Sequence, residues 1–172
     1  MLFQHEIDFA IFNDPGNNPD LAATPLIADA LHLIGASGAV RPADKCCSIS
    51  DLRDLPILLP SKTYVWRRRL ENAFHDRGTV LKLKAEVDSL VLIKELVTRG
   101  FGYTVLPRSV VHNELARGEF WAMPIHDIAS TDMLALVRLK HRKLSLAGLE
   151  LQRLLLEEAA KLAAAGWGIG AP

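Results

Sequence analysis

The sequence carries no net charge and few cysteines. Its 172 residues include 20 Lys and Arg against 20 Asp and Glu. Proteins that hold nucleic acid through their own surface usually have a basic surplus, because phosphate contacts dominate the affinity. The charge balance therefore argues against direct nucleic-acid binding by these residues. The two cysteines, Cys46 and Cys47, are adjacent and offer at most a strained vicinal disulfide, so we interpret them as reduced thiols of an intracellular protein.

Long apolar runs and a signal peptide are also missing. No run approaches the roughly 20 residues that a membrane helix needs. The first ten residues contain Glu6 and Asp8 and lack a basic start followed by an apolar stretch. We therefore expect a cytoplasmic protein with no membrane contact.

Motifs for catalysis and cofactor binding are absent. The six histidines are scattered, with no pair at the spacing of metal ligands. Gly100 and Gly102 precede an expected strand, whereas a dinucleotide fingerprint places its glycines between a strand and a helix. We interpret these two glycines as a helix cap and a tight turn. No Gly-x-Ser-x-Gly nucleophile elbow occurs. We expect no enzyme activity, no metal and no cofactor.

The apolar residues, 49% of the chain, follow an alternation of strand and helix patterns. Strands are expected over residues 7–12, 25–27, 30–35, 56–60, 80–87, 101–106, 119–125 and 133–139, and helices over 64–76, 89–100, 107–117 and 145–165. The polar stretch 37–53 is expected to be a loop. Strands that alternate with helices are typical of parallel β-α-β units, so the predicted fold class is α/β.

The last helix suggests how the chain is divided. The apolar stripe of residues 145–165 is too wide for a solvated helix, and the sheet that contains residues 7–12 is the nearest one left uncovered. We expect residues 1–29 plus 127–172 to form one lobe and residues 30–126 a second, with crossings near Ala28–Ala30 and Ile125–Asp132. Only six residues precede the first strand, so the chain is expected to start inside a domain, with its first lobe incomplete.

Polar residues follow three of the expected strands, at Ser61–Thr63, Glu86–Ser89 and Thr104–Arg108. In open α/β sheets, ligands bind beyond the carboxyl ends of the strands, where helix N-termini point free N–H groups outward. Hydroxyls in this place suit a small anion or a polar molecule with a carboxylate. The same residue types also cap helices, so the pattern leaves capping and ligand binding both open. Two basic clusters, Arg67–Arg69 and Lys140–Lys143, are interpreted as solvated faces.

Two segments of the middle region carry a family resemblance. They are D-L-P-I-L-L-P-S over Asp54–Ser61 and A-E-V-D-S-L-V-L-I-K-E-L-V-T-R-G-F-G-Y-T-V-L-P-R-S-V-V over Ala85–Val111. Together they resemble the effector-binding domain of LysR-type transcriptional regulators, and within that family the branch that includes the nitrogen assimilation control regulator. The match is specific because its glycine, proline and Glu-x-Asp-Ser positions occur together.

The resemblance implies a fold like a type 2 periplasmic binding protein, with two α/β lobes, two crossing strands and a small inducer in the cleft between the lobes. It also implies a homodimer or homotetramer. Carried over by position, the effector-binding residues are Ser61, Lys62, Thr63, Asp88, Ser89, Tyr103 and Thr104. A complete family member has an N-terminal winged helix-turn-helix domain, a linker helix and the opening elements of the first lobe. These parts are absent here, so DNA contact is expected only through the missing domain.

The leading hypothesis is an effector-sensing and oligomerisation domain of a LysR-type DNA-binding transcription regulator that binds an anionic or polar inducer. One alternative is a stand-alone solute-binding module of the same fold. A second alternative is a truncated subunit that acts by forming mixed dimers with full-length regulators.

Overall fold

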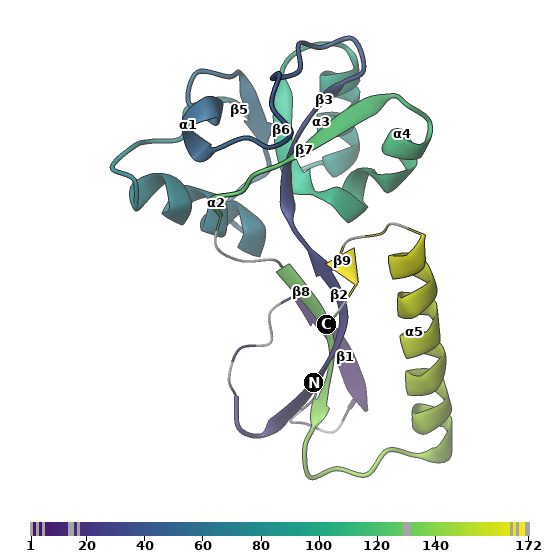
Figure 1. Cartoon of the computed structure of the whole chain (residues 1–172). Coiled ribbons are helices and arrows are strands. Elements are labelled where there is room, and N and C mark those ends of the chain that lie inside the picture. The colour runs from purple at the N-terminus through teal and green to yellow at the C-terminus, as the bar shows by residue number, and fades with distance from the viewer. Residues whose placement is uncertain are drawn as a thin grey trace. The chain divides into compact units, whose positions relative to one another are not determined.

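The computed structural model describes residues 2, 4, 6–13, 16, 18–128, 132–165, 167, 169 and 170 (Figure 1). Contacts divide the chain into two compact units, one of Met1–Asp29 with Thr131–Pro172 and one of Ala30–Ser130. We refer to these as unit 1 and unit 2. Residues 129–131, within the second expected crossing, lie outside the described residues. The lobe boundaries 1–29 plus 127–172 and 30–126 stay a prediction.

Unit 2 is built on a five-stranded sheet in the order β5-β4-β6-β3-β7. Its strands are β3 (Leu31–Ala36), β4 (Ile57–Leu59), β5 (Leu83–Glu86), β6 (Tyr103–Pro107) and β7 (Phe120–Pro124). β4 runs parallel to β5 and β6, which confirms the predicted parallel β-α-β units. β3 pairs antiparallel with β6 and β7, so the sheet as a whole is mixed.

The helices of unit 2 follow the predicted pattern with two differences. They are α1 (Ile49–Leu52), α2 (Val65–His75), α3 (Leu90–Thr98), the 3-10 helix η1 (Arg108–Val111) and α4 (His112–Ala116). The helix expected over 107–117 is split between η1 and α4. The stretch 37–53 is not loop throughout, because α1 forms at its end with a capping box between Ser48 and Asp51. Four helical residues are too few to produce a recognisable apolar period.

The core of unit 2 lies between the sheet and its helices. The helix predicted over 64–76 is confirmed as α2, and its apolar residues Trp66, Leu70, Ala73 and Phe74 are all buried. β5 is shorter than predicted, and its side chains alternate between half-buried and exposed over Leu83–Glu86. Burial of this apolar surface is the main favourable term for the unit, because the hydrophobic effect scales with the area removed from water.

Unit 1 is a four-stranded sheet in the order β1-β8-β2-β9, covered by one helix. Its elements are β1 (Phe9–Asn13), β2 (Leu21–Asp29), β8 (Asp132–Leu139), α5 (Leu146–Ala164) and β9 (Ile169–Gly170). α5 packs on this sheet as predicted, with Ala159 buried against Leu26, Ile27 and Leu136. β1 is an edge strand of this sheet, paired antiparallel with β8, and its Phe12 is 52% exposed.

Candidate functional site

The candidate site lies where two neighbouring parallel strands of unit 2 end. Ser61 follows β4 and Asp88 follows β5, and the carboxyl ends of parallel neighbours meet at one edge of the sheet. The Ser61 N–H donates a hydrogen bond to Asp88 Oδ1 at 2.9 Å. The side chain of Ser61 and then its backbone N–H lower the pKa of the Asp88 carboxyl by hydrogen bonding. An ionised carboxylate is thus fixed beside the turn after β4.

Two hydroxyls meet on the turn that joins β4 to α2. Ser61 Oγ and Thr63 Oγ1 are 2.9 Å apart, so one donates to the other. Neither caps α2, because its N-cap is Tyr64, whose side chain makes no capping bond. By contrast, Ser89 Oγ accepts from the Leu92 N–H at 3.3 Å and caps α3. Ser89 therefore caps a helix, whereas Ser61 and Thr63 do not, and effector binding by these residues stays a prediction.

Ion pairs connect this turn to α2, and they include Arg67, which the sequence analysis did not place at the site. Lys62 is exposed, and its Nζ pairs with Glu71 Oε2 at 3.1 Å. Glu71 Oε1 also pairs with Arg67 Nη2 at 2.8 Å, and Arg67 Nε donates to the Pro60 carbonyl at 3.3 Å. The Arg67 side chain is only 2% exposed, and its Nη1 is buried with no hydrogen-bond partner in the described part of the chain.

The burial of Arg67 overturns its interpretation as part of a solvated face. The helical period of α2 places it beside the buried Trp66 and Leu70, while Arg68 stays exposed. The i, i+4 spacing of Arg67 and Glu71 was the available signal, since such pairs meet on a helix surface. Because a buried charge needs partners, the pairs of Arg67 with Glu71 and Pro60 hold the start of α2 against the end of β4.

Tyr103 and Thr104 lie elsewhere along the sheet. Tyr103 stands opposite Ile57, the first residue of β4, whereas Ser61 follows the last. Thr104 is fully buried, and its hydroxyl has no hydrogen-bond partner among the residues that the structure describes. β6 runs parallel to β4, so its amino end, where these two residues lie, is away from the edge that carries Ser61 and Asp88. The structure thus brings Ser61, Lys62, Thr63, Asp88 and Ser89 together but not Tyr103 and Thr104.

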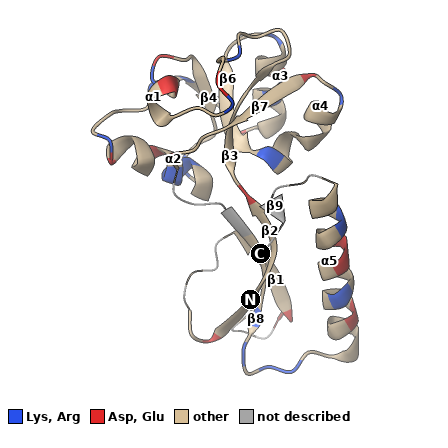
Figure 2. Ribbon diagram, in the orientation of Figure 1, with Lys and Arg blue, Asp and Glu red and all other residues tan. Residues whose placement is uncertain are grey.

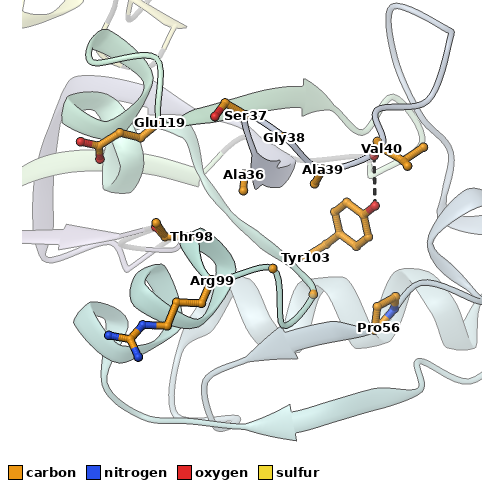
Figure 3. A pocket seen from close by; sticks show the side chains of 12 residues that line it. Ala36, Ser37, Gly38, Ala39, Val40, Pro56, Thr98, Arg99, Tyr103 and Glu119 are labelled. Atoms are coloured by element: carbon orange, nitrogen blue, oxygen red, sulfur yellow. Dashed lines mark hydrogen bonds between the residues drawn. The ribbon is translucent and has the colours of Figure 1, made fainter.

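A hollow of about 690 Å³ lies beside Tyr103 (Figure 3). The Tyr103 hydroxyl donates to the Val40 carbonyl at 3.0 Å and fixes the loop that forms one wall. Arg99 and Glu119 line the hollow, but Arg99 pairs with Glu95 at 2.6 Å and Glu119 with Arg117 at 2.8 Å. Both of these charged side chains of the hollow are thus already engaged in ion pairs.

Both cysteines are free thiols, with Cys46 exposed and Cys47 buried. Burial is the main cause that raises the pKa of Cys47 to about 12, and the nearby Asp51 adds to it. Among the described residues, no group of three or more His, Cys, Asp or Glu side chains could hold a metal ion. The described helices include none that is long and apolar enough to span a membrane.

Comparisons with known proteins place the chain in context. Residues 1–160 match the family model described as LysR substrate binding domain. The HTH-type transcriptional regulator BbuR of Bordetella bronchiseptica is 32% identical over 132 residues, which is 77% of this chain and 41% of BbuR. The nitrogen assimilation regulatory protein nac of Escherichia coli is 22% identical, over 65% of this chain and 36% of its own length. The chain thus spans about two fifths of these relatives.

The fold also matches solved structures. The regulatory domain of CcmR from Synechocystis PCC6803, solved in complex with 2-PG, superposes with a TM-score of 0.76 at 22% identity. The match covers 92% of this chain and 76% of that domain. This likeness confirms the predicted α/β fold class.

Proposed function

Because the chain belongs to the LysR substrate-binding domain family, we propose that it is the effector-sensing part of a DNA-binding transcription regulator of the cytoplasm. Its fold is of the type 2 periplasmic-binding-protein class. In this proposal the protein binds a small molecule rather than transforming one, and DNA is held by another part of the regulator. The chain's equal numbers of acidic and basic residues support this division, because phosphate contacts call for a basic surplus.

The observation that carries the proposal is the pairing of Ser61 with Asp88 at the shared end of β4 and β5. The turn offers the Ser61 and Thr63 hydroxyls next to the N-terminus of α2, which no described side chain caps. Uncapped N–H groups and the helix dipole favour an anionic group, such as a carboxylate. The ionised Asp88 would accept hydrogen bonds from a hydroxyl or ammonium group on the same ligand. This combination suits a small polar carboxylate.

Effector binding would act by shifting the equilibrium between two arrangements of the regulator. A ligand that binds one arrangement of the regulator more tightly than another moves the equilibrium by its difference in affinity. The positioning residues for this ligand would be Arg67 and Glu71, because they hold the Ser61 turn on α2 without touching the effector themselves.

A second copy of the chain is the proposed macromolecular partner. One face of α5 packs on the sheet of unit 1, yet Leu151 and Leu154 on the same helix are 49% and 44% exposed. Exposed apolar side chains that recur along one helix are typical of an interface. Sedimentation analysis of the parent and of Leu151→Lys/Leu154→Lys tests this contact. The variant is expected to sediment as a smaller species than the parent, and equal sedimentation would remove α5 from the interface.

Ligand binding is tested by a thermal-shift screen followed by calorimetry. Small carboxylates, amino acids and nitrogen metabolites are the candidates, with shikimate and 2-PG included because domains of this fold were solved with them. We expect Ser61→Ala/Thr63→Val to bind the ligand found in the screen about tenfold more weakly, because a hydrogen bond to a charged group is lost. Ser50→Ala, an exposed serine on α1, is the control and should bind as the parent does. Equal binding by parent and double variant would refute the site.

A further inference from the structure

A hollow lies in unit 1, between the end of β8 and the start of α5. Its volume is about 610 Å³, and Arg138, Lys140, Arg142 and Lys143 line it together with Leu149 and Gln152 of α5. Figure 2 shows the basic residues along the segment that connects β8 to α5. All of these residues belong to unit 1, whereas the Ser61 turn belongs to unit 2.

The positive charge at this hollow does not follow from the composition of unit 1. Residues 1–29 and 131–172 contain six Lys and Arg against nine Asp and Glu, so the unit is acidic. Four of those six basic residues fall within positions 138–143. Most of the basic residues of this acidic unit therefore lie at the end of β8 and in the turn that follows it.

Three of these four cations form no ion pair with a carboxylate of the described residues. Arg142 is held by Asp8 Oδ1 at 2.9 Å and by the Ile7 carbonyl at 3.1 Å, which fixes the turn to the chain before β1. Within the described part of the chain, no carboxylate forms an ion pair with Arg138, Lys140 or Lys143. Like charges this close repel one another, so the arrangement is stabilised by any anion that enters the hollow.

The start of α5 adds to the same potential. A helix N-terminus carries a partial positive charge, which proteins commonly balance with Asp or Glu in the first turn. The first turn of α5 contains no acidic residue, although the Ser145 hydroxyl accepts from the Gly148 N–H at 3.0 Å. Lys140 and Lys143 therefore stand beside a positive helix end, which is the reverse of the usual arrangement.

We propose that this hollow binds a small anion with two or more phosphate groups, such as a polyphosphate or a nucleoside triphosphate, separately from the effector. Several cations converging on a concave site match several phosphate oxygens at once. A volume of about 610 Å³ falls within the usual range for small-ligand pockets. Leu149 and the Gln152 amide offer an apolar contact and a hydrogen-bonding group to an organic part of the ligand.

The test is calorimetric titration of the 172-residue protein with tripolyphosphate, at low and at physiological ionic strength. Binding is expected at low salt and should weaken as salt rises, because the contacts are ionic. Lys140→Gln/Lys143→Gln is expected to bind about 10-fold more weakly. Lys45→Gln/Lys82→Gln removes the same charge from exposed positions of unit 2 and should bind as the parent does. The thermal midpoints of both variants verify that they are folded.

Three results would overturn the proposal. They are no tripolyphosphate binding at low salt, an unchanged affinity in Lys140→Gln/Lys143→Gln, or an equal loss in the control variant. A short DNA duplex is titrated in parallel, since its backbone presents the same phosphate groups. If the duplex binds more tightly than tripolyphosphate and depends on the same two lysines, the phosphates are those of nucleic acid and the small-ligand assignment is wrong. ATP binding at least as tight as tripolyphosphate binding would support the role of Leu149 and Gln152.

Discussion

Replacing Gly102 by alanine tests how β6 is seated beside β4. Gly102 has a φ of +155°, a conformation that residues with side chains rarely adopt. An added Cβ would lie 2.2 Å from the carbonyl oxygen of Pro56, just before β4. The same oxygen accepts a hydrogen bond from the Tyr103 N–H at 3.0 Å. Because the obstructing atom belongs to the backbone, the amino end of β6 has to move to make room.

We expect Gly102→Ala to lower the free energy of unfolding by about 3 kcal/mol. Strain in a sparsely populated backbone region costs about 1–3 kcal/mol, and weakening the hydrogen bond to Pro56 costs about 1 kcal/mol more. Gly100→Ala is the matched control, since Gly100 also has a positive φ, +76°, but nothing lies within 4 Å of an added Cβ. Only the left-handed conformation opposes that change, at about 1 kcal/mol.

Urea unfolding followed by tryptophan fluorescence measures both variants. Trp66 and Trp121 are buried in unit 2, the same unit as the two glycines, so their signal reports its unfolding. The slope of free energy against urea concentration should stay unchanged, which shows that the variants unfold as the parent does. If Gly102→Ala is no more destabilised than Gly100→Ala, the close approach of Gly102 to Pro56 is not a feature of the folded protein.

Three further predictions concern acid stability, the core and the thiols. Hydrogen bonds from Ser61 depress the pKa of folded Asp88, so this carboxylate stabilises the fold above about pH 4 and the benefit is lost as pH falls through the folded pKa. Asp88→Asn should therefore have a lower free energy of unfolding in urea than the parent at neutral pH, and the two free energies should become equal in acid. A gap that persists in acid would contradict this. Leu70→Ala removes a fully buried side chain of α2 and should cost about 3 kcal/mol in the same assay, and a loss below about 1 kcal/mol would mean that α2 is not packed as described. Iodoacetamide at mildly alkaline pH should alkylate Cys46 but not Cys47, because burial raises the pKa of Cys47 to about 12; mass spectrometry of the peptides decides, and rapid labelling of Cys47 would refute its burial.

Local patterns were sufficient for the elements that the candidate site needs. The helix over 64–76 and the Gly100 turn were predicted from residues within one or two helical turns of each other, and the Ser89 cap of α3 was one of the two roles that the pattern left open. In the structure, Gly100 N–H donates to the Val97 carbonyl at 2.9 Å and Phe101 N–H to the Leu96 carbonyl at 3.0 Å, which closes the helix in a Schellman motif. Such signals are readable because both partners of each bond are close in the chain.

The positions of residues that depend on the packing of other segments could not be predicted from such local patterns. The i, i+4 spacing of Arg67 and Glu71 indicates an ion pair, but the burial of Arg67 and its hydrogen bond to the Pro60 carbonyl depend on how α2 packs beside β4. The basic segment 140–143 likewise reads as a solvated run until Asp8, more than 130 positions earlier, is found pairing with Arg142.

By itself, then, the sequence determined the α/β class, the order of most strands and helices, the Gly100 turn that ends α3 and the residues that meet at the ends of β4 and β5. Periodicity and capping are local, so they need no knowledge of the partner segment. Only the tertiary structure decided that β3 pairs antiparallel with both β6 and β7, that Tyr103 and Thr104 lie away from Ser61, and that Arg67 is buried. Those outcomes depend on which strand lies beside which and in what register, and contacts between distant segments set both.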